Sequence, residues 1–150
     1  MRGPQSNVNE NGGQMSSPKS HMNVLLRSEE SGGAVSVIDN VVPADMKGPF
    51  LHTHDFDEAF YILEGELVFQ LRDELITVRE GDLAFAPRGV PHTYTNRSGA
   101  PARFVLVCTP AGFERYFARM AAKRAGVEPP EWALQPIPEV TRVGPQIGEA

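Results

Sequence analysis

The fold is decided by the stretch Gly48-Pro-Phe-Leu-His52-Thr-His54-Asp-Phe-Asp-Glu58-Ala-Phe-Tyr-Ile-Leu-Glu-Gly65. It places two histidines two residues apart and a carboxylate four residues further on. Because residues two apart on an extended strand point to the same face, His52 and His54 would direct their imidazoles at one point. Glu58 joins them once the Asp-Phe-Asp segment turns. Two neutral nitrogens and one carboxylate oxygen form a mixed ligand set for a divalent transition metal.

A third histidine lies in a second pattern, which reads Gly81-Asp-Leu-Ala-Phe-Ala-Pro87-Arg-Gly89-Val-Pro-His92-Thr-Tyr-Thr-Asn96. Together the two patterns resemble the two motifs of the cupin family. The first motif of that family is H-x-H, three or four residues, Glu, six residues and Gly. The second is Gly, five residues, Pro-x-Gly, two residues, His, three residues and Asn. Both spacings are matched, and the resemblance covers about residues 39–109. The chain departs from the family at Met46, where a glycine is usual, and has Gly48 two residues later.

The resemblance implies an all-β fold, a double-stranded β-helix or cupin jelly-roll barrel, with one divalent metal inside. The implied ligands are His52, His54, Glu58 and His92. On an octahedral ion this set leaves two positions for water, substrate or dioxygen. Fe, Mn, Ni, Co, Cu or Zn would tolerate it, whereas imidazole donors disfavour calcium and magnesium. The resemblance also implies a homodimer with N-terminal strands packed across the interface.

The residues themselves independently indicate a barrel of short strands. Apolar or alternating segments separated by turn residues predict strands, and many such segments at even spacing favour an antiparallel sandwich or barrel. The predicted strands are 23–27, 34–42, 59–63, 67–71, 75–78, 83–86, 92–96 and 103–108.

A change of period then predicts a C-terminal α-helix. Thr109-Pro110 would begin this helix and Gly126 would end it. Apolar side chains at helical spacing include Phe113, Tyr116 and Phe117. We interpret this stripe as a cover for the outside or one mouth of the barrel; alternatively, one of these aromatics helps to close a substrate pocket.

The domain organisation follows from these segments. Residues 1–22 are polar and rich in Gly, Ser and Asn, which predicts a disordered or tag-like segment, and Ser20-His21-Met22 resembles a cloning scar. Residues 23–110 form the predicted cupin barrel. Residues 111–150 comprise the helix and a proline-rich tail that we expect to be irregular, with Trp132 pinning it to the surface.

Composition excludes several classes of function. With 150 residues and 41% hydrophobic content, the chain can form one domain with a core. A net charge of −5 with dispersed basic residues argues against nucleic acid as a partner, and no apolar run is long enough for a membrane span. No signal peptide is recognisable. Cys108 cannot form an intrachain disulfide, which fits a reducing, cytoplasmic location, and its apolar setting predicts a buried structural thiol.

Strand parity also suggests which residues shape a pocket. Phe60 would share the inward face of Glu58, and Tyr94 that of His92. An aromatic cavity with a metal suits an apolar or aromatic small-molecule substrate. Candidates for the opposite wall are Phe69 and Phe85.

Three functions remain open at this point. The first is a metal-dependent, dioxygenase-like enzyme similar to the quercetinase-like cupins, in which Glu58 ligates the metal and takes a hydroxyl proton from an aromatic or phenolic metabolite. The second is a redox-neutral cyclase or isomerase that uses the metal as a Lewis acid. The third is a non-enzymatic cupin that binds a small molecule. No second titratable pair accompanies the motifs, so the metal and Glu58 would carry most of any catalysis.

Overall fold

The structure is a computed structural model that describes residues 21–148. Most of the segment predicted to be disordered or tag-like, residues 1–22, therefore lies outside the described residues. The first strand, β1, begins at His21, two residues before the predicted start of the barrel.

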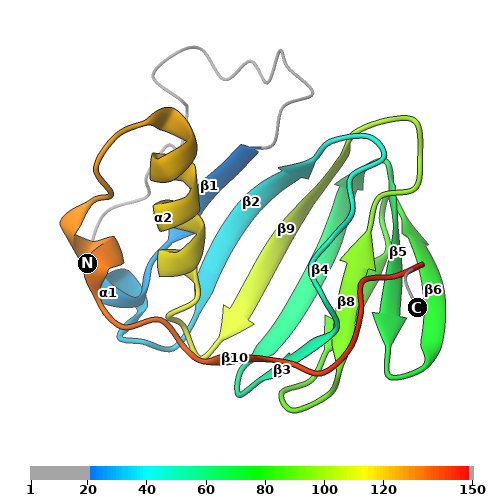
Figure 1. Ribbon diagram of the computed structural model, residues 1–150. Coiled ribbons are helices and arrows are strands. Elements are labelled where there is room, and N and C mark those ends of the chain that lie inside the picture. Colours follow the sequence, from blue (N-terminus) through cyan, green and yellow to red (C-terminus); the bar gives the residue numbers. More distant parts are fainter. Residues whose placement is uncertain (1–20, 149–150) are drawn as a thin grey trace.

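Two antiparallel sheets of five strands each are formed by the described residues, and they face each other across the interior (Figure 1). The first sheet has the order β1 (His21–Leu26), β2 (Ser36–Val42), β9 (Ala102–Thr109), β4 (Asp57–Glu64) and β7 (Leu83–Ala86). The second sheet has the order β10 (Val140–Arg142), β3 (His52–His54), β8 (His92–Thr95), β5 (Glu66–Leu71) and β6 (Glu74–Arg79). This arrangement confirms the predicted all-β, double-stranded β-helix.

Alternation along the central strands sets the core between the two sheets. On β4, Phe60 and Ile62 are buried, whereas the intervening Tyr61 is exposed. On β9, Phe104 and Leu106 are buried in the same alternating pattern. Because successive side chains of a strand point to opposite faces, each strand contributes one face to the core. The same parity carries Glu58 inward, two residues before Phe60.

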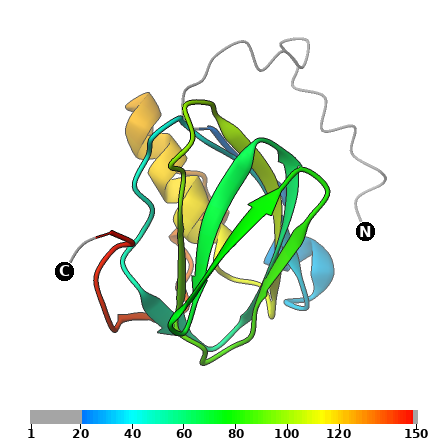
Figure 2. The same ribbon diagram turned by 90° about the vertical axis from the view of Figure 1, so that its right-hand side faces the viewer.

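The C-terminal α-helix, α2 (Glu114–Ala125), packs against β1 and β2 (Figure 1). Figure 2, seen from the side of β5 and β6, shows it at the far side of the barrel. The helix ends as predicted at Gly126, which has a left-handed φ of 68°. It does not begin at Thr109-Pro110 but at Glu114. No helix among the described residues is long and apolar enough to cross a membrane.

The predicted start of α2 is wrong, because the buried carboxylate of Glu114 holds the chain in place at a later residue. Glu114 is fully buried, and its Oε2 accepts hydrogen bonds from the backbone N–H of Ser28 at 2.7 Å and from the Ser28 hydroxyl at 2.6 Å. Its Oε1 accepts the Gly112 N–H at 2.6 Å. Ser28 begins a short helix, α1 (Ser28–Ser31), which was not predicted from the sequence. Glu114 therefore joins α1 to the first turn of α2.

The tail is more regular than predicted. It contains a 3-10 turn, η1 (Glu131–Leu134), and the strand β10, which pairs antiparallel with β3. Trp132 lies in η1, with the Arg27 guanidinium 5.1 Å from its ring centroid, so it does contact the body of the protein. β10 was not predicted because it has only three residues and all are exposed, which leaves no alternating pattern to detect.

Candidate metal centre

Three strands bring together the four side chains that the two motifs predict as ligands. His52 and His54 lie on β3, Glu58 on β4 and His92 on β8. β3 pairs with β8 so that His52 lies directly opposite His92. One ligand atom from each of the four residues lies within 4.8 Å of the others. This cluster of three histidines and one glutamate could hold a metal ion.

The inner atoms of the cluster are in direct contact. His54 Nε2 lies 2.6 Å from Glu58 Oε1, and His92 Nε2 lies 2.9 Å from the same oxygen. The two Nε2 atoms are 3.1 Å apart. His54, Glu58 and His92 are all buried, whereas His52 is half-buried.

The outer nitrogens fix the orientation of all three imidazoles. A carbonyl oxygen only accepts a hydrogen bond, so an Nδ1 atom facing one carries the proton. In a neutral ring the Nε2 lone pair then points inward, as a metal ligand requires. The Nδ1–O distances are 2.6 Å for His52 to Phe50, 2.9 Å for His54 to Phe56 and 2.8 Å for His92 to Val90.

This orientation is a test of whether the residues fit a cation. Lone pairs on His54 and His92 face each other and the carboxylate of Glu58, so each contact needs a proton or a cation between the two atoms. One divalent ion satisfies all of them at once. A donor set of three imidazoles and one carboxylate also suits a transition metal. The residues present therefore fit the metal that the motifs imply.

The pKa values of Glu58 and His52 favour the protonation states that bind a cation. Burial alone would raise the pKa of Glu58, but its interactions with the imidazoles of His54 and His92 outweigh the effect of burial and hold the pKa at about 2. Burial lowers the pKa of His52 below 6.5. Near neutral pH, Glu58 is therefore ionised and His52 is neutral, the forms in which both side chains bind metals.

Beneath the cluster lies Cys108, which is fully buried as predicted. Its Sγ is 3.9 Å from Glu58 Oε2. Burial raises the pKa of the thiol, so Cys108 stays protonated and can act as a weak donor to the carboxylate. On the other side, the Phe56 ring stacks on His54 with a centroid distance of 3.6 Å. These contacts hold two of the four ligands in place.

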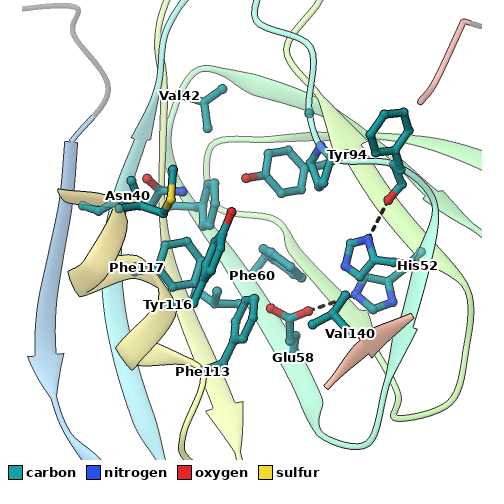
Figure 3. A pocket seen from close by; sticks show the side chains of 18 of the residues that line it. Asn40, Val42, His52, Glu58, Phe60, Tyr94, Phe113, Tyr116, Phe117 and Val140 are labelled. Carbon is teal, nitrogen blue, oxygen red and sulfur yellow. Dashed lines mark hydrogen bonds and ion pairs between the residues drawn. The ribbon is translucent and has the colours of Figure 1, made fainter. Parts of the chain in front are cut away.

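A cavity of about 610 Å³ opens from the cluster into the space between the sheets and α2 (Figure 3). Two of the four predicted pocket residues, Phe60 and Tyr94, line it. Phe69 instead lies behind them, with ring centroids 4.7 Å from Phe60 and 5.6 Å from Tyr94, and belongs to the core. The cavity has the volume typical of small-molecule sites.

The prediction that Phe85 forms part of the pocket wall is wrong, since this side chain is 48% exposed on the outside of the first sheet. On β7 the two alanines face inward instead. Ala86 lies opposite Glu58, and Ala84 lies opposite Phe60. Small residues leave room there for the metal ligand and the large ring, so Phe85 takes the outward position.

Helix α2 contributes to the cavity rather than only covering the barrel. Tyr116 and Phe117 on α2 and Phe113 directly before it all line the cavity, which supports the alternative interpretation of the aromatic stripe. Phe113 packs against Phe56 with a centroid distance of 5.1 Å and so approaches the metal cluster. Asn40, which lines the cavity from β2, was not predicted from the sequence. It could have been found by strand parity, because Asn40 lies two residues after Ile38 and therefore on the same inward face.

Comparison with known proteins identifies the domain. Residues 38–108 match the sequence model of the cupin domain family. The uncharacterized protein MJ1618 of Methanocaldococcus jannaschii is 33% identical over 75 residues, which are 49% of this chain and 58% of that protein. The chain thus spans less than two thirds of the length of this relative.

Solved structures share the same fold. TT1209 from Thermus thermophilus is 28% identical with a TM-score of 0.53, over 61% of this chain and 84% of that one. A protein from Thermotoga maritima described as a predicted oxalate decarboxylase is 26% identical with a TM-score of 0.57, over 61% and 80% of the two chains. The polyketide cyclase RemF from Streptomyces resistomycificus shares the fold at 24% identity and a TM-score of 0.54, over 60% and 64%. Together with both matched motifs and the two-sheet barrel, the family match shows that residues 38–108 form a cupin domain.

Proposed function

We propose that the protein is a metal-dependent cupin enzyme with dioxygenase-like activity on a small aromatic or phenolic metabolite. The observation that carries this proposal is the position of the histidine and glutamate cluster in the wall of an aromatic-lined cavity. His52, Glu58 and His92 all line that cavity, so a ligand inside it reaches the cluster. The proposed resident ion is one of Fe, Mn, Ni, Co, Cu or Zn, held by these three residues and His54.

In this proposal, Glu58 would act as a base, and aromatic side chains would bind the substrate. A bound divalent metal would polarise a coordinated substrate oxygen and lower the pKa of its hydroxyl. Glu58 would then accept the hydroxyl proton, because its carboxylate is ionised and faces the cavity. Phe60 and Phe104 would bind the substrate ring and exclude water from the cluster.

Oxygen dependence tests this proposal directly. Protein reconstituted with each candidate metal is assayed on a panel of phenols and flavonols, with and without dioxygen. We expect turnover with stoichiometric oxygen uptake that disappears under anaerobic conditions and in His92→Ala. Equal turnover with and without oxygen would overturn the dioxygenase assignment.

A redox-neutral cyclase or isomerase is the second candidate, and one observation favours it. Among the described residues that line the cavity, Glu58 is the only carboxylate. A metal acting as a Lewis acid could stabilise an enolate without a second acid–base residue. Bound zinc together with activity that is indifferent to oxygen would establish this function. Tight binding of a ligand without turnover would instead indicate a binding cupin.

The quaternary state and location are also proposed. We infer a homodimer in a reducing compartment such as the cytoplasm, with a small molecule rather than nucleic acid or membrane as the partner. Exposed apolar side chains on the outside of the first sheet support self-association, since such patches often mark interfaces. They are Tyr61 on β4 and Leu83 and Phe85 on β7.

A further inference from the structure

The cavity has a second polar end, separate from the metal cluster. Asn40 and the hydroxyls of Tyr94 and Tyr116 gather there (Figure 3). In that view the two hydroxyls point toward the side of Asn40 and away from Glu58 and His52. Asn40 is only 4% exposed, so its amide is shielded from bulk solvent and can be reached only from the cavity.

Strand register fixes how far apart the two ends lie. In the first sheet Glu58 lies opposite Cys108, whereas Asn40 lies opposite Phe104. Cys108 and Phe104 are four residues apart on β9, which at about 3.3 Å per residue is about 13 Å. In the second sheet Tyr94 follows His92 by two residues on the same face. The polar end is thus displaced along the strands from the metal ligands.

The band between the two ends is apolar. Halfway between the rows of Glu58 and Asn40, the register aligns Ile38, Leu106 and Phe60. All three are buried, and Leu106 and Phe60 line the cavity. A ligand that spans from one end to the other therefore crosses a strip of carbon atoms, which favours a flat apolar skeleton.

The chemistry of the second end suits an oxygen substituent. Asn40 hydrogen-bonds to the Tyr94 hydroxyl. A phenol hydroxyl such as that of Tyr94 can donate a hydrogen bond as well as accept one. Polar groups buried at the end of an apolar pocket select ligands that can hydrogen-bond to them, because an unmatched partner leaves them unsatisfied.

We propose that Asn40, Tyr94 and Tyr116 form a recognition subsite for a ligand that carries oxygen substituents at both ends of a flat, two-ring or larger apolar skeleton. One oxygen lies at the cluster of His52 and Glu58, and the other hydrogen-bonds at the subsite. The assignment of the first oxygen rests on the proposed metal-dependent function. The subsite itself is independent of the metal.

Calorimetric titration with two probes, 2,6-dihydroxynaphthalene and 2-naphthol, tests the subsite. On zinc-loaded full-length protein, we expect the diol to bind about three- to tenfold tighter than the mono-ol, the range for one further hydrogen bond. In Tyr94→Phe this ratio falls to about one, because the second hydroxyl loses its partner. Tyr116→Phe and Asn40→Leu reduce the ratio in the same direction.

Chelator-treated protein tests the subsite without the metal. There, Tyr94→Phe should weaken binding of 2-naphthol itself about threefold or more. Tyr61→Phe is the matched control, because it removes the same atom from the outer face of β4 and should leave both affinities unchanged.

The outcomes separate the two proposals. Equal affinity of the two probes for the zinc-loaded wild type, unchanged affinities in Tyr94→Phe, or no binding of either probe would overturn the subsite. Identical affinities with and without zinc, combined with a clear effect of Tyr94→Phe, would support the subsite and count against the metal-dependent function.

Discussion

The α-carbon of Gly48 lies against the main-chain carbonyl of Tyr94, so closely that a Cβ at residue 48 would be 1.7 Å from the carbonyl oxygen. This contact joins the segment that leads into β3 to strand β8. It therefore sets the spacing between the strands of His52 and His92. Gly48 lies two residues after Met46, the position where the family usually has a glycine.

Replacing this glycine should damage both the fold and the site. Gly48→Ala forces backbone atoms apart, and we expect a loss of about 2–4 kcal/mol in the free energy of unfolding together with weaker metal binding. Urea titration and elemental analysis measure the two effects. Gly99→Ala is the control, because nothing lies within 4 Å of a Cβ built there. Equal stability of the two variants would contradict the close contact.

Removal of one ligand should abolish metal binding without unfolding the barrel. We expect His92→Ala to lower metal affinity by more than about 100-fold while the far-ultraviolet circular dichroism stays unchanged. Elemental analysis of protein purified without a histidine tag or chelator provides the measurement. His21→Ala, which removes an imidazole from β1 outside the cluster, should retain full metal content. Unchanged metal in His92→Ala would reject the ligand assignment.

The buried carboxylate of Glu114 should be important for stability but not for chemistry. Both of its oxygens accept hydrogen bonds, so the amide of Glu114→Gln would face an N–H or O–H donor at Ser28 or Gly112. We expect a loss of about 2–4 kcal/mol in unfolding free energy. The exposed Glu128→Gln should change it by less than about 0.5 kcal/mol. Chemical denaturation compares the two variants, and equal midpoints would contradict this role.

The raised pKa of Tyr94 predicts a dependence of stability on alkaline pH. Above the ordinary tyrosine pKa of 10.0 the unfolded chain loses this proton, whereas the folded protein keeps it because of burial. The folded state then binds more protons than the unfolded state, so its stability falls as pH rises above that value. Denaturation midpoints measured from neutral to alkaline pH should decline less steeply in Tyr94→Phe. Identical pH profiles would show that Tyr94 ionises normally.

The outer face of the first sheet gives a test of the proposed homodimer. We expect the double variant Leu83→Glu, Phe85→Glu to be monomeric, because two buried charges destabilise an apolar interface. Light scattering coupled to gel filtration gives the mass. Leu75→Glu, an exposed leucine on β6 of the second sheet, is the matched control and should remain dimeric. A monomeric wild type would refute the homodimer.

The metal cluster was predictable from sequence because both of its determinants are local. Two-residue parity places His52 and His54 together, and the second motif supplies His92 at a fixed distance from its turn. The barrel was predictable for a similar reason, since short alternating segments with turns between them allow few other folds.

The errors concern features that depend on distant partners. A large apolar residue such as Phe85 usually faces inward, but Phe60 and Glu58 occupy that space across the strand pair. The start of α2 depends on Ser28, which is 86 residues away from Glu114 in the chain. Neither the cross-strand neighbour nor the distant donor can be recognised from a local pattern.

The pairing of β10 with β3 has a practical consequence for anyone who engineers this protein. Val140 and Arg142 form part of the cavity wall, and β10 is hydrogen-bonded to the strand that carries two of the ligands. Shortening the chain before residue 140 would widen the entrance to the cavity and free one edge of the ligand-bearing strand. Mutant libraries that seek an altered substrate preference should therefore randomise β10. This strand lies beside the ligand-bearing strand although it is more than 45 residues from the last ligand, His92, in the sequence.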